Sequence, residues 1–393
     1  MRGAERAMPP SRPRLRGPNL WTVSPRRSPG RGDDVLRAHG YHKKKQLITR
    51  ECKTMIATEM VLPGVGEPET LQMRQRELPP PGAGEVAVRV EATGVSFAEG
   101  SMRRGRYPGQ PTFPFVPGYD LVGVVEGLGP GGAGVALGQR VAAVTKTGGW
   151  ADHVVLPAAD LVPVPEGVDA AAAETAVVNG VTAWQMLHRL ARVRAGQTIL
   201  VHGATGGVGV LLVQLARLAG ARVIGTASPA KHDVVRALGA EPLDYHGDDL
   251  AARVRALAPG GVDAAFDHVG GRSLRDAWRL LAPGGTLVSY SIASLRDAQG
   301  SMMAAFIPLL ARIYLWNALP NGRHAHFYNL WGGKALRPRR FHREMHAALT
   351  EVLALLAQGH IRAQIARQLP LERAAEAMRL AESGKVVLVP GLA

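Results

Sequence analysis

Residues 197–231 read QTILVHGATGGVGVLLVQLARLAGARVIGTASPAK, and this stretch gives the clearest indication of the fold. Its apolar run Thr198–Val201 is too short for a helix and ends at a glycine turn, so we predict a buried strand. The segment Val210–Leu218 is apolar on most sides, which is typical of a helix packed on a sheet. The run Arg222–Ala227 is predicted to be the next strand. The stretch therefore forms a predicted strand–helix–strand unit.

Glycines between the first strand and the helix suggest what this unit binds. In dinucleotide-binding βαβ units, such glycines allow a tight turn, close approach of the backbone to a pyrophosphate, and close helix–strand packing. The helix N-terminus adds unpaired N–H groups and the positive end of its dipole. A glycine-rich turn in another α/β fold is the alternative. The predicted cofactor-binding loop comprises Gly203, Ala204, Thr205, Gly206, Gly207, Val208 and Gly209.

Composition and charge are those of a soluble globular protein with a basic N-terminal segment. The 393 residues suffice for two or three domains, and 46% are hydrophobic and 20% charged. The net charge is +15, but residues 1–54 alone hold 14 Lys/Arg against 4 Asp/Glu. The rest holds 33 against 28, so we do not expect it to bind nucleic acid. The single cysteine, Cys52, excludes intramolecular disulfides and cysteine-based zinc clusters.

Residues 1–54 are rich in Arg, Pro, Gly and Ser and lack apolar periodicity, so we predict that they are disordered. They are either a basic arm that contacts nucleic acid or an acidic surface, or a translated leader upstream of Met55; the composition favours the leader. The apolar segment Met302–Leu319 contains Pro308 and Arg312 and is interpreted as amphipathic or interfacial. We expect no membrane span, and without a secretory signal we expect a cytoplasmic protein.

The chain divides into a β-rich part and an α/β part. Residues 56–179 are predicted to be an all-β body compatible with a small barrel, with strands Glu85–Glu91, Leu121–Val125, Arg140–Val144 and His153–Leu156. From Val181 on, helices and strands alternate, which predicts a parallel, doubly wound sheet with helices on both faces. Beyond the opening unit its elements are helices Ala230–Leu238, Leu250–Leu257 and Ser273–Leu281, and strands Pro242–Tyr245, Val262–Val269 and Thr286–Tyr290.

The C-terminal third is expected to be more varied. Residues 295–340 are predicted to be less regular, with their aromatic side chains in the core or in a subunit interface rather than in a substrate cap. Helices are predicted over Met345–Gln358 and Glu372–Ala381, and a last strand over Val386–Val389.

Several motifs, in a fixed order, link residues 55–393 to a known family. They are Gly118-Tyr119-Asp120 with Gly123, Val125 and Gly129, then Gly138-Gln139-Arg140-Val141, Asn179-Gly180-Val181-Thr182-Ala183, the glycine loop, and Asp267-His268-Val269-Gly270-Gly271. On these motifs the chain resembles the medium-chain dehydrogenase/reductase superfamily. The resemblance implies a GroES-like catalytic β-barrel domain over 55–179, a Rossmann NADPH-binding domain over 180–335, and a C-terminal return to the catalytic domain over 340–393.

Two departures from the zinc-dependent alcohol dehydrogenases of this superfamily indicate the branch. Those enzymes place Cys-His before a Thr/Ser-Asp pair, where this chain has Ser96-Phe97-Ala98-Glu99, and Gly-His-Glu where it has Gly118-Tyr119-Asp120. Their four-cysteine zinc lobe has no counterpart here. Because zinc favours thiolate or imidazole ligands, we expect no metal. The chain instead resembles the zinc-independent quinone oxidoreductases, related to the zeta-crystallins, which fits the HGATGGVG loop and residues 89–95 and 370–377.

The residues after the second strand of the unit indicate the cofactor. An NAD site has a carboxylate there for the ribose 2′-hydroxyl, whereas this chain has Thr226-Ala227-Ser228-Pro229-Ala230-Lys231 and no acid. The Ser228 hydroxyl and Lys231 ammonium suit a 2′-phosphate, which predicts NADPH. The alternative is that Lys231 is an ordinary surface lysine. The resemblance implies that Tyr245 lines the same pocket.

The resemblance also implies candidates around the nicotinamide and the substrate. Thr182 matches a family threonine near the nicotinamide, although it could instead begin a helix. Glycine permits close backbone approach at Val269-Gly270, and Tyr290 and Ser291 should flank the ring at the carboxyl end of a strand. The candidate catalytic residues are Tyr107, which matches a tyrosine of the family's substrate cleft, and Ser96, which stands where many relatives have Asn. Tyr119 stands at the position of a lost zinc ligand, and a structural and a catalytic role both stay open for it; His202 is interpreted as a packed residue at a strand end.

Without a metal, hydride transfer needs an acceptor that is already electrophilic. The leading hypothesis is therefore an NADPH-dependent reductase of quinones or related activated carbonyls. Reduction of an alkenal or enone double bond would use the same cofactor and cleft. A different class is an NADPH-binding protein that associates with nucleic acid or a membrane surface through its basic N-terminal segment. The family resemblance further implies a homodimer.

Overall fold

The computed structural model describes residues 55–131, 134–247, 249–291 and 302–392, and no side chains of residues 302–305. The predictions about residues 1–54 and Cys52 lie outside these ranges. No helix within the described ranges is long and apolar enough to cross a membrane.

The α/β part is a six-stranded parallel sheet, as predicted. Its strands lie in the order β10-β9-β8-β11-β12-β13, and every neighbouring pair is parallel. This is the strand order of doubly wound dinucleotide-binding folds. The strands are β8 (Thr198–Val201), β9 (Arg222–Ala227), β10 (Glu241–Asp244), β11 (Val262–Asp267), β12 (Leu281–Ser289) and β13 (His324–Phe327).

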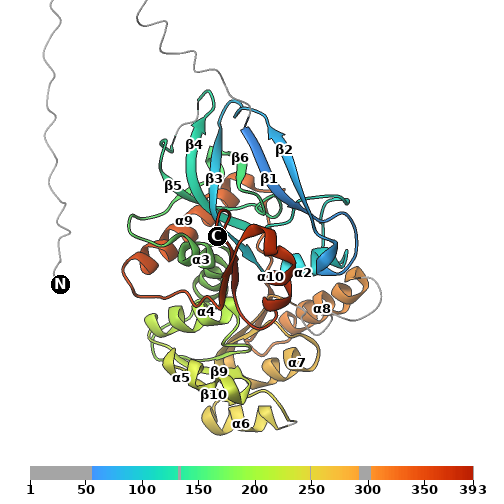
Figure 1. Cartoon of the computed structure of the whole chain (residues 1–393). Coiled ribbons are helices and arrows are strands. Elements are labelled where there is room, and N and C mark those ends of the chain that lie inside the picture. The colour runs from blue at the N-terminus through green and yellow to red at the C-terminus, as the bar shows by residue number, and fades with distance from the viewer. Residues whose placement is uncertain (1–54, 132–133, 248, 292–301, 393) are drawn as a thin grey trace, which may run out of the picture. The chain divides into compact units, whose positions relative to one another are not determined.

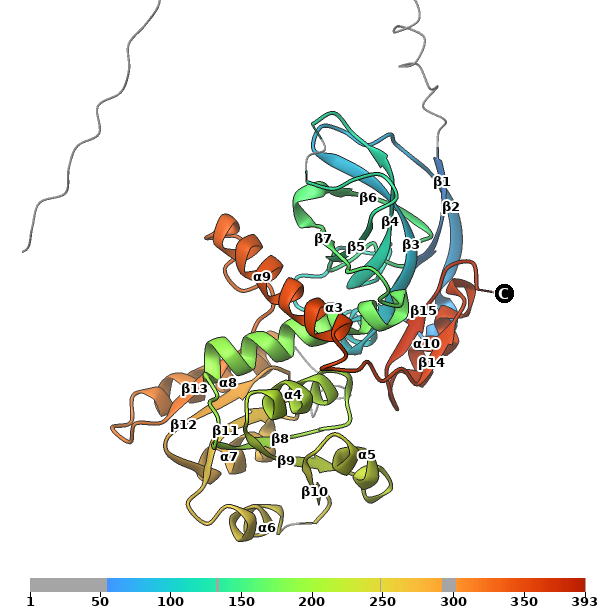
Figure 2. The same ribbon diagram turned by 90° about the vertical axis from the view of Figure 1, so that its left-hand side faces the viewer.

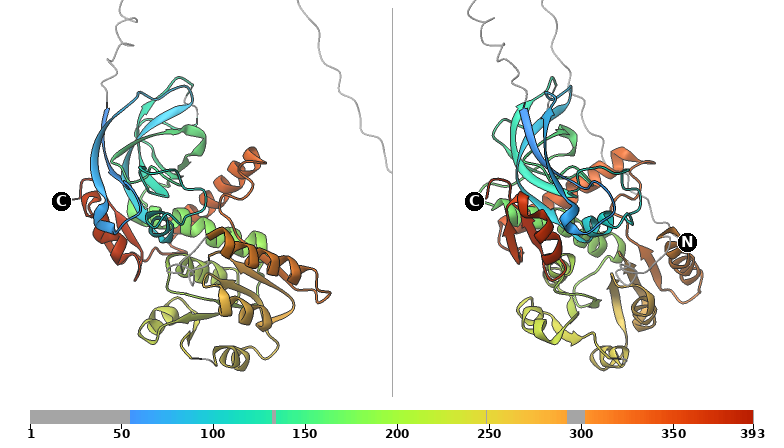
Figure 3. Two further views of the ribbon diagram at one scale, coloured as in Figure 1. Left: turned by 90° about the vertical axis from the view of Figure 1, so that its right-hand side faces the viewer. Right: turned by 45° about the vertical axis from the view of Figure 1, so that its right-hand side comes forward.

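Helices cover both faces of this sheet (Figures 1 and 3). Successive strand residues point to opposite faces: Ile199 and Val201 pack toward α4 (Gly207–Leu218) and α5 (His232–Ala237). Leu200 packs into the cluster on the other face, beneath α6 (Leu250–Leu257), α7 (Gly271–Leu280) and α8 (Met302–Asn317). Two-sided burial explains why these strands are apolar runs without alternation.

The β body consists of a seven-stranded sheet and a separate hairpin-like pair. The sheet has the order β14-β15-β3-β4-β5-β7, with β6 also paired to β3, and the pair is β1-β2. The strands are β1 (Met55–Val61), β2 (Gln72–Leu78), β3 (Glu85–Val95), β4 (Asp120–Leu128), β5 (Arg140–Val144), β6 (His153–Pro157), β7 (Val162–Pro163), β14 (Arg367–Leu369) and β15 (Val386–Leu388). The last two, with α10 (Ala374–Leu380), come from the end of the chain and lie against the β body (Figure 3, left).

The expectation that residues 56–179 form only strands is wrong. A short helix, α2 (Phe97–Arg103), follows β3, and α3 (Ala170–Trp184) begins well before residue 180. Helix α3 therefore runs across the domain boundary predicted at 179/180, and it continues into a π-helical turn, Gln185–Ala191. Its residues are mostly apolar or small and most of them are buried, so the sequence has no amphipathic periodicity that reveals the helix.

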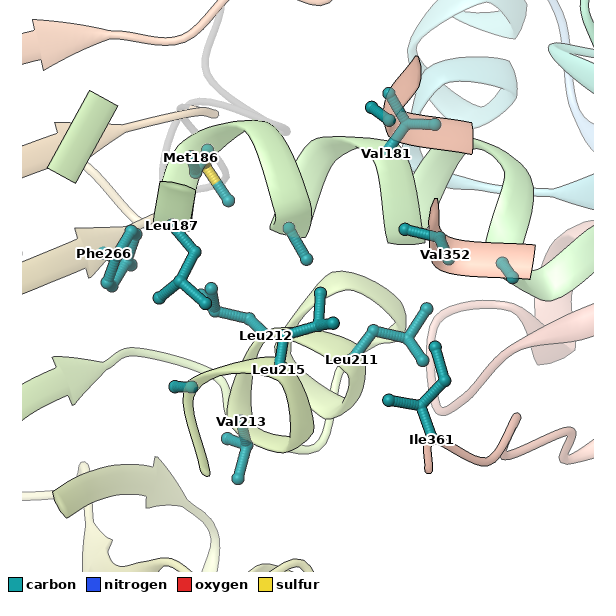
Figure 4. Close-up of a cluster of buried hydrophobic side chains, with 14 of the residues drawn as sticks. Val181, Met186, Leu187, Leu211, Leu212, Val213, Leu215, Phe266, Val352 and Ile361 are labelled. Carbon is teal, nitrogen blue, oxygen red and sulfur yellow. The ribbon is translucent and has the colours of Figure 1, made fainter. Parts of the chain in front are cut away.

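Helix α3 packs between α4 and α9 (Pro338–Ala357), as Figures 2 and 4 show. Leu187, which follows α3, joins Leu211 and Leu215 of α4 in one buried cluster, and Val352 of α9 belongs to the same cluster. Gly180 allows the close approach of α9, because a Cβ at this position would lie 2.5 Å from Val352 Cγ1.

The expectation that residues 295–340 are less regular is also wrong over their described part. Helix α8 spans Met302–Asn317 with Pro308 inside it, and β13 completes the sheet edge. Trp316 of α8 stacks on Trp278, with ring centroids 4.8 Å apart, so this aromatic residue belongs to the core as expected.

Candidate functional site

A cavity of about 1290 Å³ is lined by residues from both halves of the described chain. His202, Tyr245, His268 and Tyr290 each follow the carboxyl end of a parallel strand and line it. Ligands of open α/β sheets bind at this edge. Of the predicted site residues, those lining the cavity are Ser96, Tyr107, Thr182, Gly203, Thr205, Gly206, Gly207, Val208, Gly209, Lys231, Tyr245, Val269, Tyr290 and Ser291.

Three predicted cofactor residues, Ala204, Ser228 and Gly270, do not line this cavity. Ala204 is fully buried within the loop. Ser228 is half-buried at the turn after β9, one turn before Lys231. The Gly270 N–H donates to Asp267 Oδ2 at 2.8 Å, which shapes the loop that brings Val269 to the cavity.

The glycine loop has the geometry of an anion site. Helix α4 begins at Gly207, earlier than the predicted Val210, and its N-cap Gly206 has no side chain to accept from the first-turn N–H groups. Gly203 has φ +66°, a region that favours glycine. A Cβ at Gly209 would lie 2.1 Å from the Gly203 carbonyl oxygen. The loop therefore folds tightly enough to present backbone N–H groups at the cavity, which fits the pyrophosphate of a dinucleotide.

The cavity continues past Lys231 and Tyr245, the residues predicted for the 2′-phosphate. The Lys231 ammonium donates to the Ser383 carbonyl oxygen at 2.8 Å. An ammonium has three N–H donors, so two more can serve an anion. Tyr245 is 51% exposed and its ring lies 4.3 Å from that of His246. Lys231 is half-buried and lines the cavity.

Two histidines, the buried His202 and the half-buried His268, border the glycine loop. His202 follows β8, and its Nδ1 lies 3.4 Å from Thr226 Oγ1. A Cβ at Gly203 would lie 2.3 Å from the His268 ring, so His268 packs directly on the loop. Burial lowers the pKa of both histidines. Both are therefore neutral near pH 7, in keeping with the interpretation of His202 as structural.

Thr182 lies within α3 rather than at a helix start, so the alternative of a helix-initiating threonine is wrong. It is buried and lines the cavity, close to Tyr328. The Tyr328 hydroxyl donates to Gln185 Oε1 at 3.0 Å, and burial raises its pKa. Burial also raises the pKa of Tyr290, so both phenols stay protonated.

Tyr107, Tyr119 and Trp331 form a hydrogen-bonded aromatic cluster on the β-body side. The two tyrosine hydroxyl oxygens lie 2.5 Å apart, and Trp331 Nε1 donates to the Tyr119 hydroxyl. All three residues line the cavity. The expectation that the aromatic residues of 295–340 belong only to the core or an interface is therefore wrong for Trp331. No motif marks this tryptophan, because it joins the site from a turn far away in the sequence.

Ser96 caps a helix, and its hydroxyl proton is already engaged. Its Oγ donates to Glu99 Oε2 at 2.5 Å and accepts from the Ala98 N–H, in a capping box at the start of α2. Burial raises the pKa of Glu99, whose other oxygen accepts from the Tyr119 N–H at 2.9 Å. The geometry therefore does not favour Ser96 as a proton donor to a substrate.

A buried ion pair, which the sequence did not reveal, includes Lys385, one of the residues that line the cavity. Lys385 Nζ donates to Glu174 Oε1 at 2.8 Å, and the two side chains are 5% and 0% exposed. Burial raises the pKa of Glu174 well above its ordinary value. Burial alone would lower the pKa of Lys385, but the carboxylates of Glu174 and Asp120 outweigh it and raise that pKa. This pair joins α3 to the residue before β15.

Within the described ranges, no three His, Cys, Asp or Glu side chains are grouped so that they could hold a metal ion. Ser96 and Tyr119 stand at two positions where the zinc-dependent enzymes supply ligands, and both are committed to the hydrogen bonds described above.

Two family models match successive parts of the chain. The alcohol dehydrogenase GroES-like domain matches residues 82–166, within the β body, and the zinc-binding dehydrogenase family matches residues 238–387. The first of these supports the predicted GroES-like fold of the β body.

Individual relatives match most of the chain. The synaptic vesicle membrane protein VAT-1 homolog of Rattus norvegicus is 33% identical over 352 residues, which cover 84% of this chain and 84% of that protein. A mycobacterial protein solved in complex with NADPH is 30% identical with a TM-score of 0.73, and a quinone oxidoreductase of Pseudomonas syringae is 30% identical with a TM-score of 0.72. Each match covers 85% of this chain and 100% of the other. The chain belongs to the medium-chain dehydrogenase/reductase superfamily, in its zinc-independent, quinone oxidoreductase-like branch.

Proposed function

We propose that this protein is an NADPH-dependent reductase that delivers a hydride to a quinone or a similar activated carbonyl compound. The observation that carries the proposal is that one cavity is lined both by the glycine loop at the start of α4 and by Tyr107 and Tyr119. Hydride transfer requires donor and acceptor in contact, so a reductase needs its cofactor loop and its oxygen-binding groups in one shared space.

The cofactor end of the cavity suits NADPH. Bound NADPH would supply the hydride, with its pyrophosphate against the first-turn N–H groups of α4. Lys231 would bind the 2′-phosphate, with Ser228 nearby and Tyr245 against the adenosine. Thr182, Val269 and Tyr290 would surround the nicotinamide. The mycobacterial relative that was solved with NADPH supports this choice of cofactor.

The acceptor end suits a flat, electrophilic compound. The chain's own groups would orient the acceptor, exclude water, and donate a hydrogen bond to the oxygen on which negative charge develops. Tyr107 is the donor we assign to this role, because it lines the cavity and the Ser96 hydroxyl is engaged with Glu99. Burial raises the pKa of Tyr107, so the phenol carries its proton at neutral pH. The quinone oxidoreductase of Pseudomonas syringae supports a quinone as acceptor.

The test is turnover by the purified full-length protein, followed as loss of NADPH absorbance with ortho-quinones, para-quinones and alkenals as acceptors. We expect the fastest turnover with a quinone and slower turnover when NADH replaces NADPH. Faster reduction of alkenals would favour the double-bond reductase instead. Absence of turnover with every acceptor would contradict an enzyme of either kind.

The cytoplasmic location and the homodimer stay predictions.

A further inference from the structure

We propose that Trp331 and Tyr119 are positioning residues that hold the Tyr107 hydroxyl with its proton directed into the cavity, toward the oxygen of the bound acceptor. This inference rests on the proposed function and specifies how its proton donor is prepared. The three residues come from distant parts of the chain: Tyr107 follows α2, Tyr119 precedes β4, and Trp331 lies between β13 and α9.

The direction of the hydrogen bonds follows from the chemistry of the three groups. An indole N–H can only donate, so the bond from Trp331 uses the Tyr119 oxygen as acceptor. If Tyr107 also donated to that oxygen, the Tyr119 proton would have no acceptor among the described residues. Tyr119 is only 4% exposed, so water is a poor substitute. The arrangement that satisfies every group has Tyr119 donating to Tyr107, which leaves the Tyr107 proton for the cavity.

The electrostatics agree with this direction. Burial raises the pKa of both phenols, so both are protonated before reaction. Their mutual hydrogen bond opposes the rise at Tyr107 and adds to it at Tyr119. Tyr107 is thus the phenol that gives up a proton more readily, because its anion is stabilised by the hydroxyl behind it.

Neighbouring side chains hold the cluster of Tyr107, Tyr119 and Trp331 in place from two sides. The Trp331 ring stacks on Phe341 of α9 with centroids 5.8 Å apart, and the Lys334 ammonium lies 4.9 Å from the Trp331 ring centroid. A cation over the indole draws electron density from the ring and strengthens its N–H as a donor. On the other side, the backbone N–H of Tyr119 is held by the buried carboxyl of Glu99.

The proton step balances the hydride step. A quinone needs one hydride, which bound NADPH would supply, and one proton to become a hydroquinone. The O–H bond of Tyr107 breaks as a new O–H bond forms on the acceptor. The phenolate left on Tyr107 is stabilised by the Tyr119 hydrogen bond, and it regains a proton from water when the product leaves.

Kinetics of four single variants and one double variant test the proposal. We expect Tyr107→Phe to lower kcat about 100-fold, as loss of an oxyanion donor does. Tyr119→Phe and Trp331→Phe should each lower kcat about tenfold, the effect of losing one hydrogen bond, with the KM for NADPH unchanged. Tyr314→Phe is the matched control, because Tyr314 is 75% exposed and is not one of the cavity-lining residues. In the double variant, Trp331→Phe should cause no further loss of kcat beyond that of Tyr107→Phe alone. Additive losses would overturn the proposal, because they would show that Trp331 acts independently of Tyr107.

A spectroscopic measurement tests the cluster without turnover. In protein labelled with ¹⁵N-tryptophan, Trp331→Phe identifies the indole N–H resonance of Trp331. We expect Tyr119→Phe to shift that resonance strongly, and Tyr107→Phe to shift it less. If the Trp331 resonance of Tyr119→Phe has the same position as in the wild-type protein, the proposed hydrogen bond from Trp331 to Tyr119 is wrong. If the wild-type protein reduces no acceptor but the resonance shifts as expected, the proposed function fails while the hydrogen-bond arrangement stands.

Discussion

Lys231 carries the cofactor preference that we infer, and its replacement tests it. Lys231→Ala removes the ammonium that would face a 2′-phosphate, and a charge-assisted hydrogen bond of this kind is worth about 1.5–3 kcal/mol. We therefore expect the KM for NADPH to rise about 10- to 100-fold while the KM for NADH changes little. The measurement is steady-state turnover with each cofactor.

Arg236→Ala provides the control for Lys231→Ala. Arg236 is an exposed cation of the neighbouring helix α5, paired with Asp233, and it does not line the cavity. Its removal should leave both KM values unchanged. Equal losses for NADPH and NADH in Lys231→Ala would mean that Lys231 acts through its bond to the Ser383 carbonyl, and not through the phosphate.

Candidate site residues could be named from the sequence where a local motif carries the chemistry. The glycine loop and Lys231 belong to one continuous strand–helix–strand unit, so their common location follows from the motif. Trp331 and Lys385 reach the cavity only through tertiary folding, and neither belongs to a local pattern. Ser96 shows the limit of matching single positions. Its position matched a family site, but the Glu three residues later makes it a helix cap.

The contact between α3 and α9 depends on Gly180. Gly180→Ala would place a Cβ 2.5 Å from Val352 Cγ1, and such overpacking typically costs about 1–3 kcal/mol of unfolding free energy. Combining it with Val352→Ala removes the clashing atom, so we expect the double variant to lose less stability than the two single variants together. Chemical denaturation measures the three values.

Gly64→Ala is the matched control for Gly180→Ala, because a Cβ at Gly64 would meet nothing within 4 Å. It should change the free energy of unfolding by no more than about 0.5 kcal/mol. Strict additivity of Gly180→Ala and Val352→Ala would show that α9 does not rest on α3 through this pair.

Elements were predictable from the sequence where burial is one-sided or the run is bounded by turns. The strands Arg222–Ala227 and Arg140–Val144 and the helix Leu250–Leu257 have the predicted bounds. Helix α3 was missed because its fifteen residues are packed between the β body, α4 and α9, and such a helix shows no polar face. Helix α8 was not predicted because a proline such as Pro308 usually interrupts a helix.

The two halves of the described chain are joined through the buried pair of Lys385 and Glu174. Lys385→Met leaves the Glu174 carboxylate without its cation, which costs about 3–5 kcal/mol when a buried pair is broken. Because burial raises the folded-state pKa of Glu174 above 4.5, protonation favours the folded state. The stability deficit of Lys385→Met should therefore shrink as the pH falls.

Denaturation of Lys385→Met and of Lys385→Met combined with Glu174→Leu separates the charge effect from lost packing. The double variant should recover part of the stability at neutral pH, since it removes the Glu174 carboxylate, although the buried Asp120 carboxylate also loses its neighbouring cation. A double variant as unstable as Lys385→Met, or a deficit that does not depend on pH, would show that the charge of Glu174 is not the cause.

The C-terminal strand β15 has a consequence for synthesis of the chain. It pairs with β3 in the register Val386 to Val95, so the β body needs residues made at both ends of the described sequence. The six parallel strands, by contrast, come from one continuous segment that ends at Phe327. As the protein leaves the ribosome, the cofactor-binding half can fold first. The edge of β3 stays unpaired until the last residues have been made. A chain released a few codons early would keep a folded dinucleotide domain beside an unfinished β body.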